Sequence, residues 1–169
     1  DTKDGVLFEN LRTYDQARIT NKAEMFDVNG ALTSDLALVK SVVITSQVGR
    51  KFVFEVITLA GGALGGRLTQ IKDRNGYAVV LTYKTWTQAE IDASQTRQYQ
   101  IATVTDPFGR VMSFNYETIQ VSGQWVVSSV VLPNMQTLAY TYAGGFLTQV
   151  THPDGTHSNF SYSTEPISQ

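Results

Sequence analysis

Apolar and polar residues alternate in several short stretches of this chain, and the stretches repeat one pattern around a turn-like centre. Four of them align when they are centred on Gly76, Gly109, Met135 and Gly155. A tyrosine stands seven residues after each centre, in the order Tyr83, Tyr116, Tyr142 and Tyr162. Residues three, five and seven places after a centre share one face of a strand, because side chains alternate. The pattern therefore predicts β-hairpins whose tyrosine face is buried or half-buried.

Apolar residues also precede each centre, in two columns. The column five residues before the centre holds Ile71, Val104, Val130 and Val150. The column eight residues before it holds Leu68, Ile101, Val127 and Leu147. Positions three apart lie on opposite faces of a regular strand. Two interpretations stay open: a β-bulge lies between the columns, or both faces of the sheet are partly covered.

The centres themselves have turn chemistry. Asp106-Pro107-Phe108-Gly109 fits a type I turn, with Asp accepting backbone bonds at the first position and Gly at the fourth. Asp73 and Gly76 fill the same two positions, whereas Met135 replaces the glycine of its copy. A degenerate fifth copy surrounds Gly49 and lacks both the Asp and the Tyr.

These patterns predict an all-β protein, an antiparallel meander of repeated hairpins in an open sheet that can curl toward a shell. Residues 41–169 carry the hairpins, which are regular from about residue 65. Residues 1–40 lack clean alternation, and we expect an irregular lead made of divergent hairpins or of a cap over the first edge. The insertion Thr87–Arg97 either extends strands or forms an excursion with a short helical turn. Gly61–Arg67 is interpreted as a flexible connection.

With its hairpins aligned, the chain resembles the RHS/YD-repeat family over about Val42–Tyr162. The segment GGRLTQIKDRNGYAVVLTY carries that family's Gly-Arg-Leu-Thr, a D-x-x-G turn and a final Tyr, and GGFLTQVTHPDGTHSNFSY carries its Leu-Thr, a turn and a terminal aromatic-x-Tyr. YDQARIT at Tyr14–Thr20 is similar to the Tyr-Asp signature. The resemblance implies a β-strip that spirals into a hollow shell, in bacterial secreted or cell-surface proteins that enclose a toxin or form a scaffold. The family's D-P-x-G-Leu self-cleavage ending is missing, because Arg110 follows Gly109.

Composition narrows the partners. The chain has 169 residues, 42% hydrophobic and 17% charged, with a net charge of −2 and no cysteine. This is a globular composition without a basic cluster, so we expect neither nucleic acid nor an anionic membrane as partner. Without cysteine there are no disulfides or thiol nucleophiles. No apolar run approaches the ~18 residues of a membrane span. Because the chain begins at Asp1 without a signal-peptide pattern, we expect a processed product or a piece of a larger protein.

Three groups of residues are candidates for chemistry or binding. Asp73 and Asp106 could form a hydrolytic carboxylate pair, but their shared repeat position favours turn capping, and we predict no catalysis. His152 and His157 would need a further ligand to hold a metal, so no metal or cofactor is predicted. Aromatic side chains could stack on sugars or pack across strands; they are Trp86, Tyr99, Trp125 and Tyr77.

The leading expectation is a non-catalytic structural segment of a larger secreted or cell-surface protein, contributing to a β-shell or scaffold. Its partners would be neighbouring repeats of a longer chain. The alternative is a self-contained extracellular module that binds glycan through exposed aromatics or assembles with copies of itself through open edges. The structural repeat positions are Asp73, Gly76, Tyr83, Asp106, Gly109, Tyr116, Tyr142, Gly155 and Tyr162.

Overall fold

The fold is all-β and consists of an open antiparallel meander, as the alternating pattern predicts. The computed structural model describes residues 22–59, 62–93, 95–119 and 123–162. The chain divides into two compact units, Asp1–Gly109 and Arg110–Gln169. The Tyr-Asp segment Tyr14–Thr20 and the remainder of residues 1–21 lie outside the described residues.

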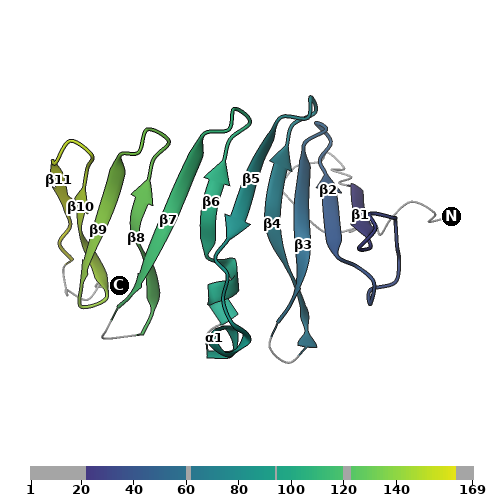
Figure 1. Ribbon diagram of the computed structural model, residues 1–169, viewed down its shortest axis with the longest axis horizontal. Coiled ribbons are helices and arrows are strands. Elements are labelled where there is room, and N and C mark those ends of the chain that lie inside the picture. Colours follow the sequence, from purple (N-terminus) through teal and green to yellow (C-terminus); the bar gives the residue numbers. More distant parts are fainter. Residues whose placement is uncertain (1–21, 60–61, 94, 120–122, 163–169) are drawn as a thin grey trace, which may run out of the picture. The chain divides into compact units, whose positions relative to one another are not determined.

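In the first unit, each strand pairs antiparallel with the next one along the chain (Figure 1). The strands are β1 (Lys22–Phe26), β2 (Ser41–Thr45), β3 (Lys51–Thr58), β4 (Leu64–Lys72), β5 (Ala78–Tyr83) and β6 (Ile101–Thr105). Helix α1 (Gln88–Ala93) and the 3-10 turn η2 (Gln95–Tyr99) stand between β5 and β6. Because β1 pairs with β2, the sheet already begins within the segment expected to be irregular.

The second unit continues the same topology with its own strands. They are β7 (Val111–Thr118), β8 (Trp125–Val131), β9 (Thr137–Ala143), β10 (Phe146–Thr151) and β11 (His157–Asn159). Each again pairs antiparallel with its chain neighbour inside the unit. Among the residues that the structure describes, no helix is long and apolar enough to cross a membrane.

The turns at the repeat centres share one hydrogen-bond pattern. In the turn that starts at Asp73, the Gly76 N–H donates to the Asp73 carbonyl at 3.2 Å, and the Asp73 N–H donates to the Tyr77 carbonyl at 2.9 Å. The fourth residue has positive φ: 93° at Gly76, 80° at Gly109, 82° at Gly155 and 65° at Met135. This is a type I turn followed by a left-handed residue, a common hairpin connection whose twist suits the flanking strands. Met135 therefore occupies a position that favours glycine.

A one-residue bulge lies between the two apolar columns and explains why they are three residues apart. Opposite β3, the register passes from Val53–Gln70 to Phe54–Leu68, so that Thr69 is the extra residue. The same shift leaves one extra residue seven places before each later centre: Ala102, Ser128 and Thr148. The bulge brings both apolar columns onto one face of the sheet.

The repeat tyrosines fasten the hairpins where their strands separate beyond the bulge. The Tyr83 hydroxyl donates to the Leu68 carbonyl at 2.5 Å, and the Tyr142 hydroxyl donates to the Val127 carbonyl at 2.9 Å. The Tyr162 hydroxyl makes the equivalent bond to the Leu147 carbonyl at 2.9 Å. Each acceptor belongs to the column eight residues before the centre. The tyrosine column thus hydrogen-bonds to the apolar column before it in three repeats.

The two faces of the sheet differ in character within each unit. One face carries the paired apolar residues, such as Ile71 opposite Val79 and Tyr140 opposite Val150. The other face carries paired polar residues: the Thr82 and Thr103 hydroxyls lie 2.7 Å apart, and the Asn115 amide donates to Ser129 at 3.0 Å. The repeat apolar residues of the first three copies are half-buried or, at Val130, buried, as predicted. In the last copy Phe160 and Tyr162 are exposed.

Candidate functional site

The largest departure from the repeat pattern is the excursion of residues 84–100 between β5 and β6 (Figure 1). Thr87 and Glu90 form a capping box at the start of α1: the Thr87 N–H and hydroxyl donate to the Glu90 carboxylate at 2.8 and 2.7 Å. The Thr87 donors hold the pKa of Glu90 below its usual value. The Lys84 N–H donates to the Gln100 carbonyl at 2.8 Å and closes the base of the excursion. The insertion is therefore an excursion with a short helix, the second of the two expected forms.

Gly65 allows the excursion to approach β4 closely. A Cβ at this position would lie 2.9 Å from the Tyr99 hydroxyl and 3.0 Å from the Leu59 Cδ2. Both distances are too short for an ordinary side chain, so the contact depends on glycine. The expected flexible connection at Gly61–Arg67 is wrong for its second half, because Leu64–Lys72 is strand β4. The glycine provides close packing there instead of a loose joint.

Arg67 joins three elements around the base of the excursion. Its Nε pairs with the Glu55 carboxylate on β3, and its Nη1 donates to the Gln98 carbonyl at 2.8 Å. Its guanidinium lies over the Tyr83 ring, 4.6 Å from the ring centre. Burial raises the pKa of Tyr83, against the opposing effect of Arg67, so the phenol stays protonated and donates to Leu68.

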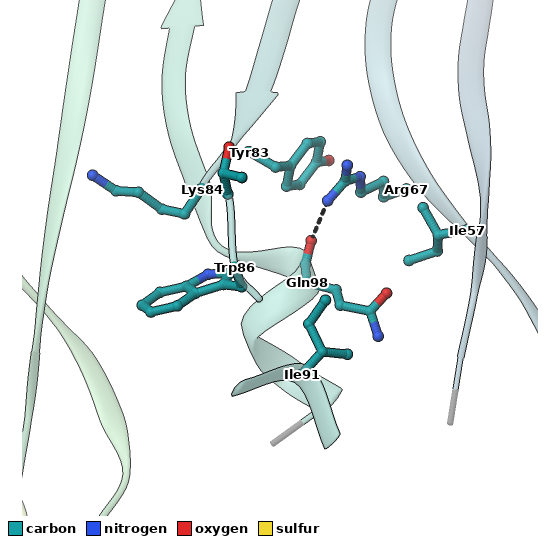
Figure 2. Close-up of a pocket in the computed structure, with 8 residues that line it drawn as sticks. Ile57, Arg67, Tyr83, Lys84, Trp86, Ile91 and Gln98 are labelled. Carbon is teal, nitrogen blue, oxygen red and sulfur yellow. Dashed lines mark hydrogen bonds between the residues drawn. The ribbon is translucent and has the colours of Figure 1, made fainter. Parts of the chain in front are cut away.

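A cavity of about 210 Å³ opens between this network and the excursion (Figure 2). It is lined by Ile57, Arg67, Tyr83, Lys84, Thr85, Trp86, Ile91 and Gln98. Ile57 and Ile91 give it aliphatic walls, while Thr85, Arg67 and Gln98 add polar groups. Apolar walls with a few placed polar groups are the usual composition of a small-molecule site.

Gln98 is the most unusual of the lining residues. Only 5% of it is exposed, and its side-chain Nε2 has no hydrogen-bond partner among the described residues. Gln100 is 8% exposed, and its Oε1 is likewise without a partner there. A buried amide without a partner costs about 1–3 kcal/mol. Figure 2 shows the Gln98 amide extending between Arg67 and Ile91, toward Ile57.

The predicted aromatic residues lie in different environments. Trp86 is half-buried and lines the cavity, with the Arg97 guanidinium 5.3 Å from its ring centre. Tyr99 is 42% exposed and belongs to the same excursion. Trp125 is the first residue of β8 in the second unit, where it is half-buried. Tyr77 is 58% exposed beside the Asp73 turn. Within the first unit, Trp86 therefore lines a cavity, and Tyr99 lies in the same excursion.

The carboxylates and histidines make local bonds. The Asp73 carboxylate accepts the N–H groups of Asn75 and Tyr77 at 2.8 and 2.9 Å, and Asp106 accepts that of Phe108 at 2.9 Å. These bonds give both aspartates the turn-capping contacts expected of their column. His152 Nε2 lies 2.8 Å from the Ser158 hydroxyl, and His157 Nδ1 lies 3.1 Å from that of Thr151. The described residues contain no group of three acidic or histidine side chains that could hold a metal.

Sequence patterns indicated Trp86 and the repeat position Tyr83 among the residues that line this cavity, but not Arg67 or Gln98. Arg67 was assigned to a loop, and Gln98 lies in the polar segment SQTRQYQ, which has no apolar periodicity. Their contact joins positions 31 residues apart and depends on how the excursion folds back. The available signal was the length of the insertion itself, since loops longer than about 12–15 residues are often functional.

No protein-family profile matches the chain, and no curated protein matches it significantly.

Proposed function

We propose that this chain is a non-catalytic structural segment of a larger secreted or cell-surface protein of the RHS/YD-repeat type. Its hairpins would form part of a bacterial β-shell or scaffold. The observation that supports this proposal most is the repeated fastening of a tyrosine hydroxyl to a carbonyl fifteen residues earlier, at Tyr83, Tyr142 and Tyr162. The bond repeats because the hairpin repeats, and strips of such hairpins suit a scaffold.

The burial pattern supports the same proposal. The apolar face is half-buried in most repeats, and no large side chain is fully buried in the part of the chain that the structure describes. A sheet with one apolar face gains stability when another surface covers that face. In a shell, the apolar face would line an enclosed interior, and neighbouring repeats would pair with the sheet edges.

The direct test is the intact mass of the native protein in its source, together with its distribution between cell, surface and medium. We expect a mass well above 18.6 kDa in the surface or secreted fraction. A native mass near 18.6 kDa would contradict a segment of a larger shell. Recovery from the cell interior alone would contradict the proposed location.

Glycan binding is the second candidate function, and the cavity beside Trp86 favours it. Trp86 and Tyr99 share the excursion, whereas Trp125 lies on β8 of the other unit. Retention on immobilised glycans should therefore fall in the Trp86→Ala protein and persist in the Trp125→Ala protein. Retention that depends equally on both tryptophans would favour a broad aromatic surface over the cavity.

A further inference from the structure

We propose that the cavity beneath the excursion binds a single uncharged sugar ring, with the Gln98 amide donating to one of its oxygens. This inference rests on the second candidate function, glycan binding, and names its site and ligand class. It starts from Gln98 Nε2, a buried donor without a partner among the described residues, on a side chain that lines the cavity (Figure 2). A ligand oxygen would remove the cost of that unpaired donor.

The charges around the cavity favour an uncharged ligand. The one arginine that lines it, Arg67, is paired with the Glu55 carboxylate and also donates to the Gln98 carbonyl. Figure 2 shows the Lys84 amino group pointing away from Arg67 and Gln98. The cavity thus offers donor groups with little net charge, whereas an anionic ligand is usually met by an unpaired cation.

The size and walls of the cavity fit one sugar ring. Its volume of about 210 Å³ lies below the ~300–1,000 Å³ typical of sites for drug-sized ligands. Ile57 and Ile91 can pack against the C–H face of a sugar, while Gln98, Thr85 and Arg67 can bond its hydroxyl oxygens. A purely apolar ligand would leave the Gln98 amide unsatisfied.

Stacking of a flat aromatic ligand is less favoured by the same geometry. The Tyr83 ring already carries the Arg67 guanidinium at 4.6 Å, and the Trp86 ring carries that of Arg97 at 5.3 Å. Each cation covers ring area that a stacked ligand would need. Hydrogen bonding through Gln98, with aliphatic contacts, remains the stronger mode of recognition.

A titration with methyl glycosides tests the proposal on the whole chain. The probes are the methyl glycosides of glucose, galactose, mannose and N-acetylglucosamine, each compared with methyl glucuronide, and binding is followed by protein NMR shifts. We expect at least one neutral glycoside to bind, and Gln98→Met to weaken it about tenfold, the size expected for one lost hydrogen bond. Gln100→Met is the matched control, because it removes a buried unpaired amide that does not line the cavity. It should leave binding unchanged.

Other results would overturn the proposal. Failure of every neutral glycoside to bind, or binding of methyl glucuronide alone, contradicts an uncharged sugar. Equal weakening by Gln98→Met and Gln100→Met contradicts a specific role for Gln98. The variant Ile91→Trp separates the site from the function, because it fills the cavity. Glycan retention that survives Ile91→Trp overturns the proposed site but not glycan binding. If neither the wild type nor any variant is retained on glycans, both the site and the glycan-binding function are overturned.

Discussion

Two hairpins share one set of repeat positions but differ in what surrounds them: residues 68–83 in the first unit and residues 127–142 in the second. Both have a bulge seven residues before the centre, at Thr69 and at Ser128. In both, a tyrosine hydroxyl bonds to the carbonyl that precedes the bulge. Burial is the largest cause of a raised pKa in Tyr83 and in Tyr142. The shared positions therefore hold the hairpin in the same way in each unit.

The differences begin just outside the shared positions. The residue nine places before the centre is Arg67 in one hairpin and Val126 in the other. Tyr83 is followed by the helical excursion, whereas Tyr142 is followed by Ala143 and a tight glycine turn into β10. The cavity lies at the hairpin with the arginine and the excursion. Thus the repeat positions provide the scaffold, and the departures from them build the candidate site.

Removing the tyrosine ring should have the largest effect on stability, and the size of the loss should differ between the two hairpins. Tyr83→Ala and Tyr142→Ala each lose a half-buried ring and a hydrogen bond, so we expect a loss of about 2–4 kcal/mol in urea unfolding. Tyr83→Ala should lose more, because Arg67 also packs on that ring. Tyr77→Ala, an exposed turn position, should change stability by less than about 0.5 kcal/mol. Equal small losses in all three proteins would contradict the fastening role.

Gly65→Ala should be the next largest change and should affect one hairpin alone. The new Cβ would press on the Tyr99 hydroxyl and on Leu59, and such overpacking costs about 1–3 kcal/mol. The neighbouring Gly66→Ala is the control, because its nearest contact would be an ordinary 3.8 Å. Adding Tyr99→Phe should recover part of the loss. Equal effects at Gly65 and Gly66 in thermal unfolding would show that close approach is not the reason for glycine.

The sequence predicts the turns and the apolar face because each depends on neighbours along the chain. Asp73 and Gly76 favour a turn through their own backbone preferences, and the alternation of side chains places Leu81 and Tyr83 on the same face of the strand. The sequence alone does not decide whether a bulge lies at Thr69, because a three-residue spacing of apolar columns is compatible with a bulge or with two covered faces. Here a register shift, visible only in the paired strands, gives the answer.

The cavity could not be predicted in this way, because its contacts join distant residues. Nothing local in LGGRLTQ indicates that Arg67 meets Gln98, or that Gly65 meets Tyr99. Gln98 stands in a polar segment and would ordinarily be exposed. Its burial depends on the fold of the whole excursion.

Met135→Gly should stabilise the second-unit hairpin by a smaller amount. Met135 has φ of 65°, a conformation that costs an ordinary residue about 1–2 kcal/mol, and part of the gain is offset by the greater freedom of glycine when unfolded. We therefore expect a gain of about 0.5–1 kcal/mol in urea unfolding. The reverse change, Gly76→Ala, should cost a similar amount in the first unit, because a Cβ there would meet no atom within 4 Å and the strain is in the backbone. A loss of stability in Met135→Gly would mean that the methionine side chain contributes more than its backbone costs.

Phenylalanine variants of the two tyrosines separate the effect of the hydroxyl from that of the ring. Tyr83→Phe and Tyr142→Phe keep the packing and lose one hydrogen bond each, for about 0.5–1.5 kcal/mol in urea unfolding at neutral pH. The pKa of each tyrosine is raised above the usual 10.0, so the folded state holds the phenol proton more tightly than the unfolded state. This contribution to stability is complete below pH 10 and is lost as the pH rises through the higher folded pKa. Wild-type stability should therefore fall more steeply above pH 10 than that of either Phe variant. Parallel pH profiles would show that ionisation of these phenols is not coupled to unfolding.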